Sequence, residues 1–303
     1  MRITDRPQTG GSPTFATRAD SCSHPHLQAL VEQARSRGCI AVAVAYPCDA
    51  ASIEAAHAAA HADLIRPLLV GPRSRIEEAA AAAGLPIAGF ALHDTADDPR
   101  AAAARAVALC RDGEAAALMK GALHSDDLLG AAVGRDAGLR TVRRATHVFV
   151  MDVPGVERPL LITDCVVNIA PTLADKRDIA QNAIDLAHAL GIGTPRMAIL
   201  SAVETVNPAI PGTIDAAALC KMADRGQIRG AVLDGPLAFD NAISLQSALN
   251  KGIASAGAEC AGLVLGMRVP IVLTSRSDSV ASRIASCALA VLMSSPRAVE
   301  CAA

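Results

Sequence analysis

A short apolar run near the end of the chain leads directly into hydroxyl and charged side chains. In the segment VPIVLTSRSDS (269–279), Ser275 and Arg276 follow the apolar residues, and Asp278 comes two positions later. The next residues, 280–293, have the apolar face of a helix. A strand end that meets a helix N-terminus brings together free backbone N–H groups, hydroxyls and a guanidinium, a combination that binds phosphate. The plainer alternative is a helix N-cap with a surface ion pair between Arg276 and Asp278.

A second stretch has the side chains and the turn that an anion site needs. In LMKGALHSDDLL (118–129), Lys120, Gly121 and Ser125 lie where a turn from a strand to a helix is expected to approach an anion. The glycine permits close backbone approach to an anion. A surface lysine at a strand end is the alternative for Lys120. Arg144, which precedes another predicted strand, is a further candidate anion ligand.

Polar residues at the ends of other predicted strands favour structural roles. LITD ends at Asp164, and AVLDGP ends with Asp234, Gly235 and a proline. A single Asp or Ser at such a place is more often the N-cap of the next helix than a reacting group. Asp234 and Gly235 are therefore predicted to build turns and not to take part in chemistry. Arg283, one to two turns into the helix of 280–293, is predicted to be solvated.

The chain alternates short β-branched runs with alanine-rich amphipathic segments, which predicts an α/β fold. Predicted strands cover 39–47, 64–72, 86–94, 147–154, 159–169, 196–204 and 230–239. Predicted helices cover 75–84, 98–113, 175–191 and 213–226, each ending at a glycine. This alternation predicts a parallel sheet with helices on both faces, where ligand sites collect at the carboxyl ends of the strands.

The composition argues against several classes of function. The 303 residues include 28 basic and 30 acidic side chains, so a formal charge of −2 favours neither nucleic acid nor a membrane surface as a partner. One Tyr, four Phe and no Trp leave few platforms for stacking bases. The nine cysteines show neither Cys-x-x-Cys pairs nor zinc spacing, which predicts reduced thiols and no metal site. Residues 1–26 are predicted to form a flexible tail, and no run is apolar enough for a membrane span, so we expect a cytoplasmic protein.

Several long phrases of the sequence resemble the phosphate acetyltransferase and phosphate butyryltransferase family. They are LMKGALHSDDLL (118–129), LLITDCVVNIAPTLADKRDIAQNAIDLAHALGI (160–192), MAILSAVETVNPAIPGTIDAAALCKMADRGQI (197–228), VLDGPLAFDNAIS (232–244) and VPIVLTSRSDS (269–279). The resemblance implies reversible transfer of an acetyl or butyryl group between acyl-CoA and inorganic phosphate. The CoA thioester is then a substrate, and no cofactor is expected. It also implies direct attack of the CoA thiolate on the acyl phosphate in a ternary complex.

The resemblance further implies an architecture similar to isocitrate and isopropylmalate dehydrogenases, with two α/β domains and a cleft between them. Residues 27–146 together with 262–303 are expected to form the first domain, and 147–261 the second. A homodimer is the expected assembly.

The same resemblance implies roles for individual residues. Ser275 is expected to hydrogen-bond the reacting oxygen and Arg276 to hold the phosphate. Asp278 is the nearest candidate for the base that deprotonates the CoA thiol. Substrate-binding roles are expected for Lys120, Gly121, Ser125, Arg144, Asp234 and Gly235, the last two as part of the cleft wall.

One segment of the family pattern is missing from this sequence. After NKGIASAGAE (250–259) the chain passes almost directly to CAGLVLGMRVPIV, so a strand and a helix are expected to be absent near 255–260 and the second domain to be shortened. Their loss removes part of one cleft wall and exposes a strand edge. Three interpretations follow: an active acyltransferase, a CoA- or phosphate-binding relative with little or no catalysis, and, from the fold alone, a decarboxylating dehydrogenase. The third lacks a Gly-x-Gly-x-x-Gly fingerprint.

Overall fold

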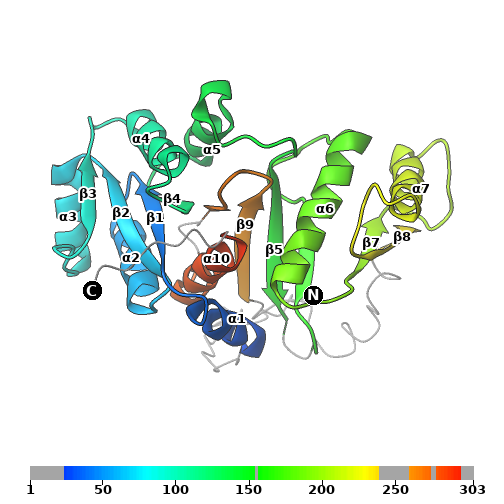
Figure 1. Ribbon diagram of the computed structural model, residues 1–303, viewed down its shortest axis with the longest axis horizontal. Coiled ribbons are helices and arrows are strands. Elements are labelled where there is room, and N and C mark those ends of the chain that lie inside the picture. Colours follow the sequence, from blue (N-terminus) through cyan, green and yellow to red (C-terminus); the bar gives the residue numbers. More distant parts are fainter. Residues whose placement is uncertain (1–23, 154–155, 239–258, 274–277, 295–303) are drawn as a thin grey trace, which may run out of the picture.

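The computed structural model describes residues 24–153, 156–238, 259–273 and 278–294. These residues form an eight-stranded sheet, a separate two-stranded sheet and the helices that pack on both (Figure 1). Among the helices within these ranges, none has the length and apolar character that crossing a membrane requires. Two of the predicted site residues, Ser275 and Arg276, lie outside the described residues.

The large sheet is parallel on one side and antiparallel on the other. Its strand order is β3-β2-β1-β4-β10-β9-β5-β6. Strands β3 to β10 run parallel to their neighbours, whereas β9 is antiparallel to both β10 and β5, and β6 is antiparallel to β5. The strands span Ile40–Ala45 (β1), Ile65–Gly71 (β2), Ala91–Asp94 (β3), Ala117–Lys120 (β4), Thr146–Asp152 (β5), Leu160–Thr163 (β6), Glu259–Leu265 (β9) and Ile271–Val272 (β10).

The prediction of a parallel sheet is wrong for the side that contains β9, β5 and β6. A parallel connection within a sheet needs a dozen or more residues, which usually include a helix. Residues 153–159 join β5 to β6, and residues 266–270 join β9 to β10. Because both connections are too short for a helical crossover, each pair of strands runs antiparallel.

Helices cover both faces of the large sheet, as the alternation of strands and helices predicts. Along β1, Val42 and Val44 join one buried cluster while Ala41, Ala43 and Ala45 join the other, because successive side chains of a strand point to opposite faces. The first cluster includes α1 (Pro25–Arg35), α2 (Ala50–His61), α3 (Arg73–Ala83) and α10 (Val280–Met293), and the second includes α4 (Pro99–Asp112) and α5 (Ser125–Val133).

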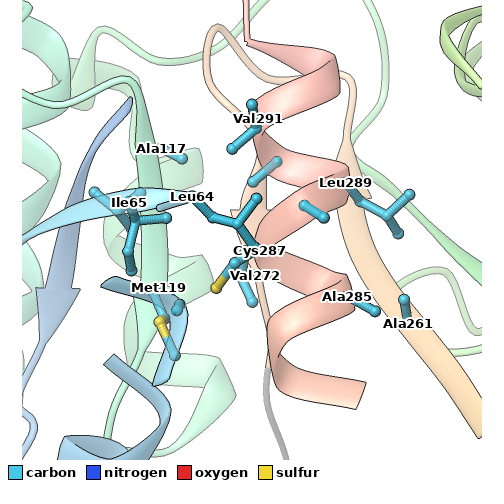
Figure 2. Close-up of a cluster of buried hydrophobic side chains, with 14 of the residues drawn as sticks. Leu64, Ile65, Ala117, Met119, Ala261, Val272, Ala285, Cys287, Leu289 and Val291 are labelled. Atoms are coloured by element: carbon cyan, nitrogen blue, oxygen red, sulfur yellow. The ribbon is translucent and has the colours of Figure 1, made fainter. Parts of the chain in front are cut away.

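Helix α10 lies deep in the first cluster. Figure 2 shows Ala285 beside Ala261 of β9, and Cys287 beside Val272 of β10, all of them fully buried. Small side chains at these contacts let the helix approach the strands closely, and interiors packed in this way are rigid. Helix α10, which follows the segment 269–279, is therefore fixed to the sheet.

The helix boundaries follow from local signals in the sequence. Gly84 and Gly113 end α3 and α4 in the left-handed conformation, with φ of 66° and 84°, which confirms the predicted stops. Helix α6 (Leu173–Ala189) begins with a capping box in which the side chains of Thr172 and Asp175 each accept the backbone N–H of the other residue. Helix α7 (Pro211–Asp224) and the short 3₁₀ helix η1 (Arg135–Ala137) complete the set in the described ranges.

A smaller unit lies on the far side of α6 from the large sheet (Figure 1). Within the described residues it consists of the parallel strands β7 (Arg196–Leu200) and β8 (Val232–Leu237) with α7 packed on them. Its own buried cluster contains Ala180 and Ile184 of α6, together with Leu219 and Ile228. Other residues of α6 belong to the first cluster of the large sheet. Helix α6 is thus part of two cores.

The large sheet combines strands from both ends of the chain. Strands β9 and β10 insert between β4 and β5, so residues from about 262 onward complete the N-terminal part of the fold. Strands β5 and β6, which the resemblance placed in the second domain, also belong to this sheet. The segment expected to be missing near 255–260 falls mostly on residues 239–258, outside the described part of the chain.

Candidate active site

The carboxyl ends of β4 and β10 lie side by side at one edge of the large sheet. Lys120 is the last residue of β4, and the residue before it, Met119, pairs with Val272 of β10. The chain therefore leaves β10 next to the end of β4, two positions before the undescribed residues that include Ser275 and Arg276. In open α/β sheets, ligands bind outside the carboxyl ends of parallel strands.

The turn after β4 is pressed against the turn after β1. Gly121 N donates to Ala45 O at 2.9 Å, and Ala122 N donates to Tyr46 O at 2.8 Å. A Cβ on Gly121 would lie 2.4 Å from Ala45 O and 2.5 Å from Tyr46 O, so another residue requires the backbone to shift. Lys120, half-buried, stands immediately before this contact. The close approach predicted for Gly121 is thus present, and it is an approach to neighbouring backbone.

Helix α10 begins directly after the segment 269–279, whose sequence includes Ser275 and Arg276. It starts at Val280, as predicted, and the Ser279 hydroxyl accepts a hydrogen bond from Ser282 N at 3.0 Å. Its first turn contains no acidic residue, so its free N–H groups and its dipole favour an anion. Asp278, half-buried, precedes the helix by two positions.

Arg283 is buried, and the prediction that it is solvated is wrong. Its residue exposure is 5%, and its Nη1 donates to Ala51 O of α2 at 2.9 Å. The prediction failed because α1, α2 and β9 surround α10 and leave almost no face open to water between Ser282 and Leu292. A guanidinium held in this poorly solvated position adds positive potential one turn into α10.

The N-terminus of α5 is less suited to an anion than that of α10. Ser125 is its first residue, and Asp126 and Asp127 follow in the first turn. Carboxylates at this place satisfy the helix dipole and repel a phosphate. Arg100 Nε lies 3.1 Å from Asp127 Oδ1 and compensates one of the two charges.

Three side chains that the sequence analysis did not single out form a network at the same edge. The Tyr46 hydroxyl donates to Asp97 Oδ1 at 2.6 Å, and Arg75 Nη1 donates to Asp97 Oδ2 at 3.1 Å. The hydrogen bond to Asp97 raises the pKa of Tyr46 to about 12, and the same bond lowers the pKa of Asp97 below its usual value. Tyr46 is the only tyrosine of the chain and lies one residue before the end of the predicted strand 39–47, but nothing local points to a partner 51 residues away.

Cys48 lies two residues after Tyr46, in the turn that follows β1. Burial raises the pKa of its thiol to about 12. A cysteine acts as a nucleophile through its thiolate, and almost none is present near neutral pH at such a pKa. Cys48 is therefore not suited to carry an acyl group.

Arg144 lies toward the opposite edge of the sheet. It precedes β5, which runs in the same direction as β4, whereas Lys120 ends β4. One row of paired residues crosses the intervening strands and consists of Leu118, Ile271, Val264 and His147. Lys120 is two positions beyond this row and Arg144 three positions before it, which separates them by about 17 Å along the strands. The structure therefore does not bring Arg144 together with Lys120.

Arg144 is instead surrounded by polar groups of the segment that enters α6. Its Nε donates to Asn168 Oδ1 at 2.8 Å and lies 3.7 Å from Asp175 Oδ1, and its backbone N donates to Asp178 Oδ2 at 2.9 Å. Asn168 Nδ2 in turn donates to Asp164 Oδ2 at 2.6 Å. These contacts tie the start of β5 to α6.

Asp234 and Gly235 lie on β8 of the small sheet. Asp234 is exposed, and its Oδ1 accepts from Gly235 N at 2.9 Å. A Cβ on Gly235 would lie 2.8 Å from Ile199 O, so the glycine permits close contact between β8 and β7. Helix α6 stands between these residues and the large sheet (Figure 1). Within the described ranges, no three His, Cys, Asp or Glu side chains are grouped to hold a metal ion.

Comparison with known proteins gives a consistent result. The sequence pattern of a family described as phosphate acetyl/butaryl transferase matches residues 99–261. A phosphate acetyltransferase of Rhizobium meliloti is 51% identical over 295 residues, which cover 88% of this chain and 93% of the relative. A phosphate butyryltransferase of Clostridium beijerinckii is 37% identical over 279 residues, which cover 83% and 92%. Among solved structures, a branched-chain phosphotransacylase from Enterococcus faecalis superposes with a TM-score of 0.69 at 25% identity, covering 84% of this chain and all of that one.

Proposed function

Given that this chain belongs to the phosphate acetyltransferase and phosphate butyryltransferase family, we propose that it moves an acetyl or butyryl group reversibly between coenzyme A and inorganic phosphate. It is a phosphate acyltransferase. The observation that carries this conclusion is the 51% identity to a phosphate acetyltransferase over nearly the whole of both chains. The alternative of a CoA-binding relative without turnover is not favoured, because the related acetyltransferases and butyryltransferases match over most of this chain.

The proposed reaction is a direct transfer in a ternary complex. The CoA thiol loses its proton to a base, the thiolate sulfur attacks the carbonyl carbon of the acyl phosphate, and the bond between that carbon and the phosphate oxygen breaks. Inorganic phosphate leaves with the electron pair, and acyl-CoA forms. The protein's tasks are positioning, proton removal and stabilisation of the charge that develops on oxygen.

The proposed phosphate site lies at the edge of the large sheet where β4 and β10 end. Ser275 hydrogen-bonds the reacting oxygen, Arg276 holds the phosphate, and Lys120 adds a second cation. Supporting observations are the adjacent ends of the two strands and the acid-free first turn of α10. Buried Arg283 adds to the positive potential there. Ser125, five residues after Lys120 and the first residue of α5, is a further proposed substrate ligand.

The small sheet forms the proposed second cleft wall, as in the two-domain architecture that the family resemblance implies. Asp234 and Gly235 belong to this wall, and Arg144 is a substrate ligand in the space between the walls. A shortened second domain is part of the proposal. The alignment with the Rhizobium meliloti relative has 295 positions but covers only 88% of the 303 residues of this chain, so this chain has gaps at some of those positions. These gaps support the shortened domain.

Acyl-CoA and phosphate are the proposed partners, with no nucleic acid and no membrane. The proposed assembly is a homodimer in the cytoplasm. Val232 and Leu200 on the small sheet are 55% and 49% exposed, apolar surface of the kind that a second subunit covers.

The function is tested by mixing the purified protein with acetyl-CoA or butyryl-CoA, with and without phosphate, and measuring free thiol. We expect release only when phosphate is present, with the acyl group recovered as acyl phosphate. Binding of CoA without release would favour the non-catalytic alternative instead. The ratio of the two rates also measures acyl-chain preference, because one methylene changes the free energy of recognition by about 1–3 kcal/mol.

Asp278 is proposed as the base that accepts the thiol proton, and Asp278→Asn tests this role. A thiol of pKa about 8.5 is mostly protonated at pH 7 and mostly ionised at pH 9.5, so the base matters only at the lower pH. We expect kcat for acyl-CoA formation to fall about 100-fold at pH 7, and the defect to shrink as the pH rises above the thiol pKa. Asp112→Asn, which removes an exposed carboxylate at the end of α4, is the control. A small loss of the same size at every pH would indicate that Asp278 only supports the start of α10.

A further inference from the structure

We propose that Tyr46 is a positioning residue for the acyl transfer, which holds the turn of residues 120–122 in the place that phosphate binding requires. The inference rests on the proposed function, in which Lys120 contributes to the phosphate site. Tyr46 and this turn lie within the described part of the chain, at the carboxyl ends of the neighbouring strands β1 and β4.

The backbone of Tyr46 is the surface on which this turn rests. Its carbonyl oxygen accepts from Ala122 N at 2.8 Å, and the oxygen of the preceding Ala45 accepts from Gly121 N at 2.9 Å. Because Gly121 has no side chain, the two turns meet backbone to backbone. A shift of the Tyr46 carbonyl therefore moves Gly121 and, with it, Lys120.

The position of that carbonyl depends on an unfavourable backbone conformation. Tyr46 has φ of 53°, in the left-handed region that a residue with a bulky side chain rarely adopts. Such a conformation persists only where the surroundings determine it from several sides. Here Tyr46 N donates to Val70 O of β2 at 2.7 Å, and its own carbonyl also accepts from Cys48 N at 2.9 Å.

The side chain of Tyr46 supplies the remaining anchor. Its ring belongs to the buried cluster beneath α4 and α5, which includes Leu123 just after the turn. Its hydroxyl donates to Asp97, and Asp97 accepts from Arg75 of α3 through its other oxygen. The carboxylate of Asp97 thus joins three segments, which are the turn after β1, the turn after β3 and the first turn of α3. Because the pKa of Tyr46 is raised to about 12, its hydroxyl remains protonated near neutral pH and so remains a hydrogen-bond donor.

The expected consequence is a loss of phosphate affinity that does not extend to CoA. Lys120 is the only charged side chain in the turn of residues 120–122, and it acts on the small doubly charged substrate. A ligand as large as CoA has many contacts, so a small displacement of one turn affects its binding less. A general weakening of the fold would change both affinities together.

The experiment compares the full-length protein with Tyr46→Phe, Asp97→Ala and the double variant. Dissociation constants for inorganic phosphate and for CoA are measured by calorimetry, and kcat is measured with acetyl-CoA and phosphate. We expect roughly a tenfold weaker phosphate affinity in each single variant, with CoA affinity unchanged. The double variant should resemble the single ones, because both changes break the same hydrogen bond. Asp112→Ala, which removes a comparable exposed Arg–Asp pair from the end of α4, should leave phosphate affinity as it is.

Each outcome decides the matter. Unchanged phosphate affinity in Tyr46→Phe, or equal losses for phosphate and CoA, would overturn the positioning role. A wild-type protein that binds phosphate but shows no turnover would refute the proposed function, and the comparison of phosphate affinities would still test Tyr46. A wild-type protein that binds no phosphate would refute both.

Discussion

Replacing Arg276 with alanine is expected to lower kcat/KM for phosphate by two to three orders of magnitude, roughly the cost of removing one preorganised charged donor from a developing oxyanion. The guanidinium fork makes two parallel hydrogen bonds to a phosphate, and a nearby lysine acts only as a point charge. The thermal unfolding midpoint should change little, because a charged side chain that serves to bind phosphate contributes little to the core.

Free thiol released from acetyl-CoA, measured as a function of phosphate concentration, checks this expectation. Arg111→Ala is a suitable control, since it removes an exposed guanidinium that is paired with Asp112 away from the carboxyl ends of the strands. An Arg276→Ala enzyme with wild-type phosphate dependence would remove Arg276 from the site. The segment would then be explained by the plainer alternative, a helix cap with a surface ion pair.

Replacing Gly121 with alanine is expected to reduce activity about 100-fold, because a misplacement of about 1 Å at a reacting group has an effect of this size. The added Cβ would lie 2.4 Å and 2.5 Å from the carbonyl oxygens of Ala45 and Tyr46, which are backbone atoms at the end of a buried strand. The turn must therefore move away from β1 and take Lys120 with it. The free energy of unfolding should fall by about 1–3 kcal/mol.

Gly130→Ala provides a matched control for this change. Gly130 lies in α5, nine residues after Gly121, and a Cβ there meets no atom within 4 Å. Alanine at an open helical position stabilises a protein by about 0.4–1 kcal/mol, so this variant should be active and slightly more stable. If Gly121→Ala were as active as Gly130→Ala, the turn after β4 would have no part in substrate binding.

The sequence was sufficient to predict features with local causes. The glycines that end α3 and α4, and the start of α10 at Val280, follow from short-range rules and are confirmed. The antiparallel part of the sheet was missed because periodicity describes a strand and says nothing of its neighbours.

Contacts between distant parts of the chain account for the other differences. Arg283 lies in a helix that packs against β9, α1 and α2 among other elements, which no local pattern reveals. The hydrogen bond between Tyr46 and Asp97 joins residues 51 positions apart. Arg144 was grouped with Lys120 by chemistry, and the strand register is what separates them.

Because α6 is part of two cores, the small unit and the large sheet are expected to unfold in a fixed order. In the described part of the chain, the small unit has two strands and a buried cluster of four hydrophobic residues, two of which α6 provides. Two strands alone are only marginally stable in water. The stability of β7, β8 and α7 therefore depends on their contact with α6, which the large sheet already holds in place. Backbone amides of β7 and β8 should then exchange while those of α6 are still protected. Once α6 loses its protection, β7, β8 and α7 should lose theirs as well.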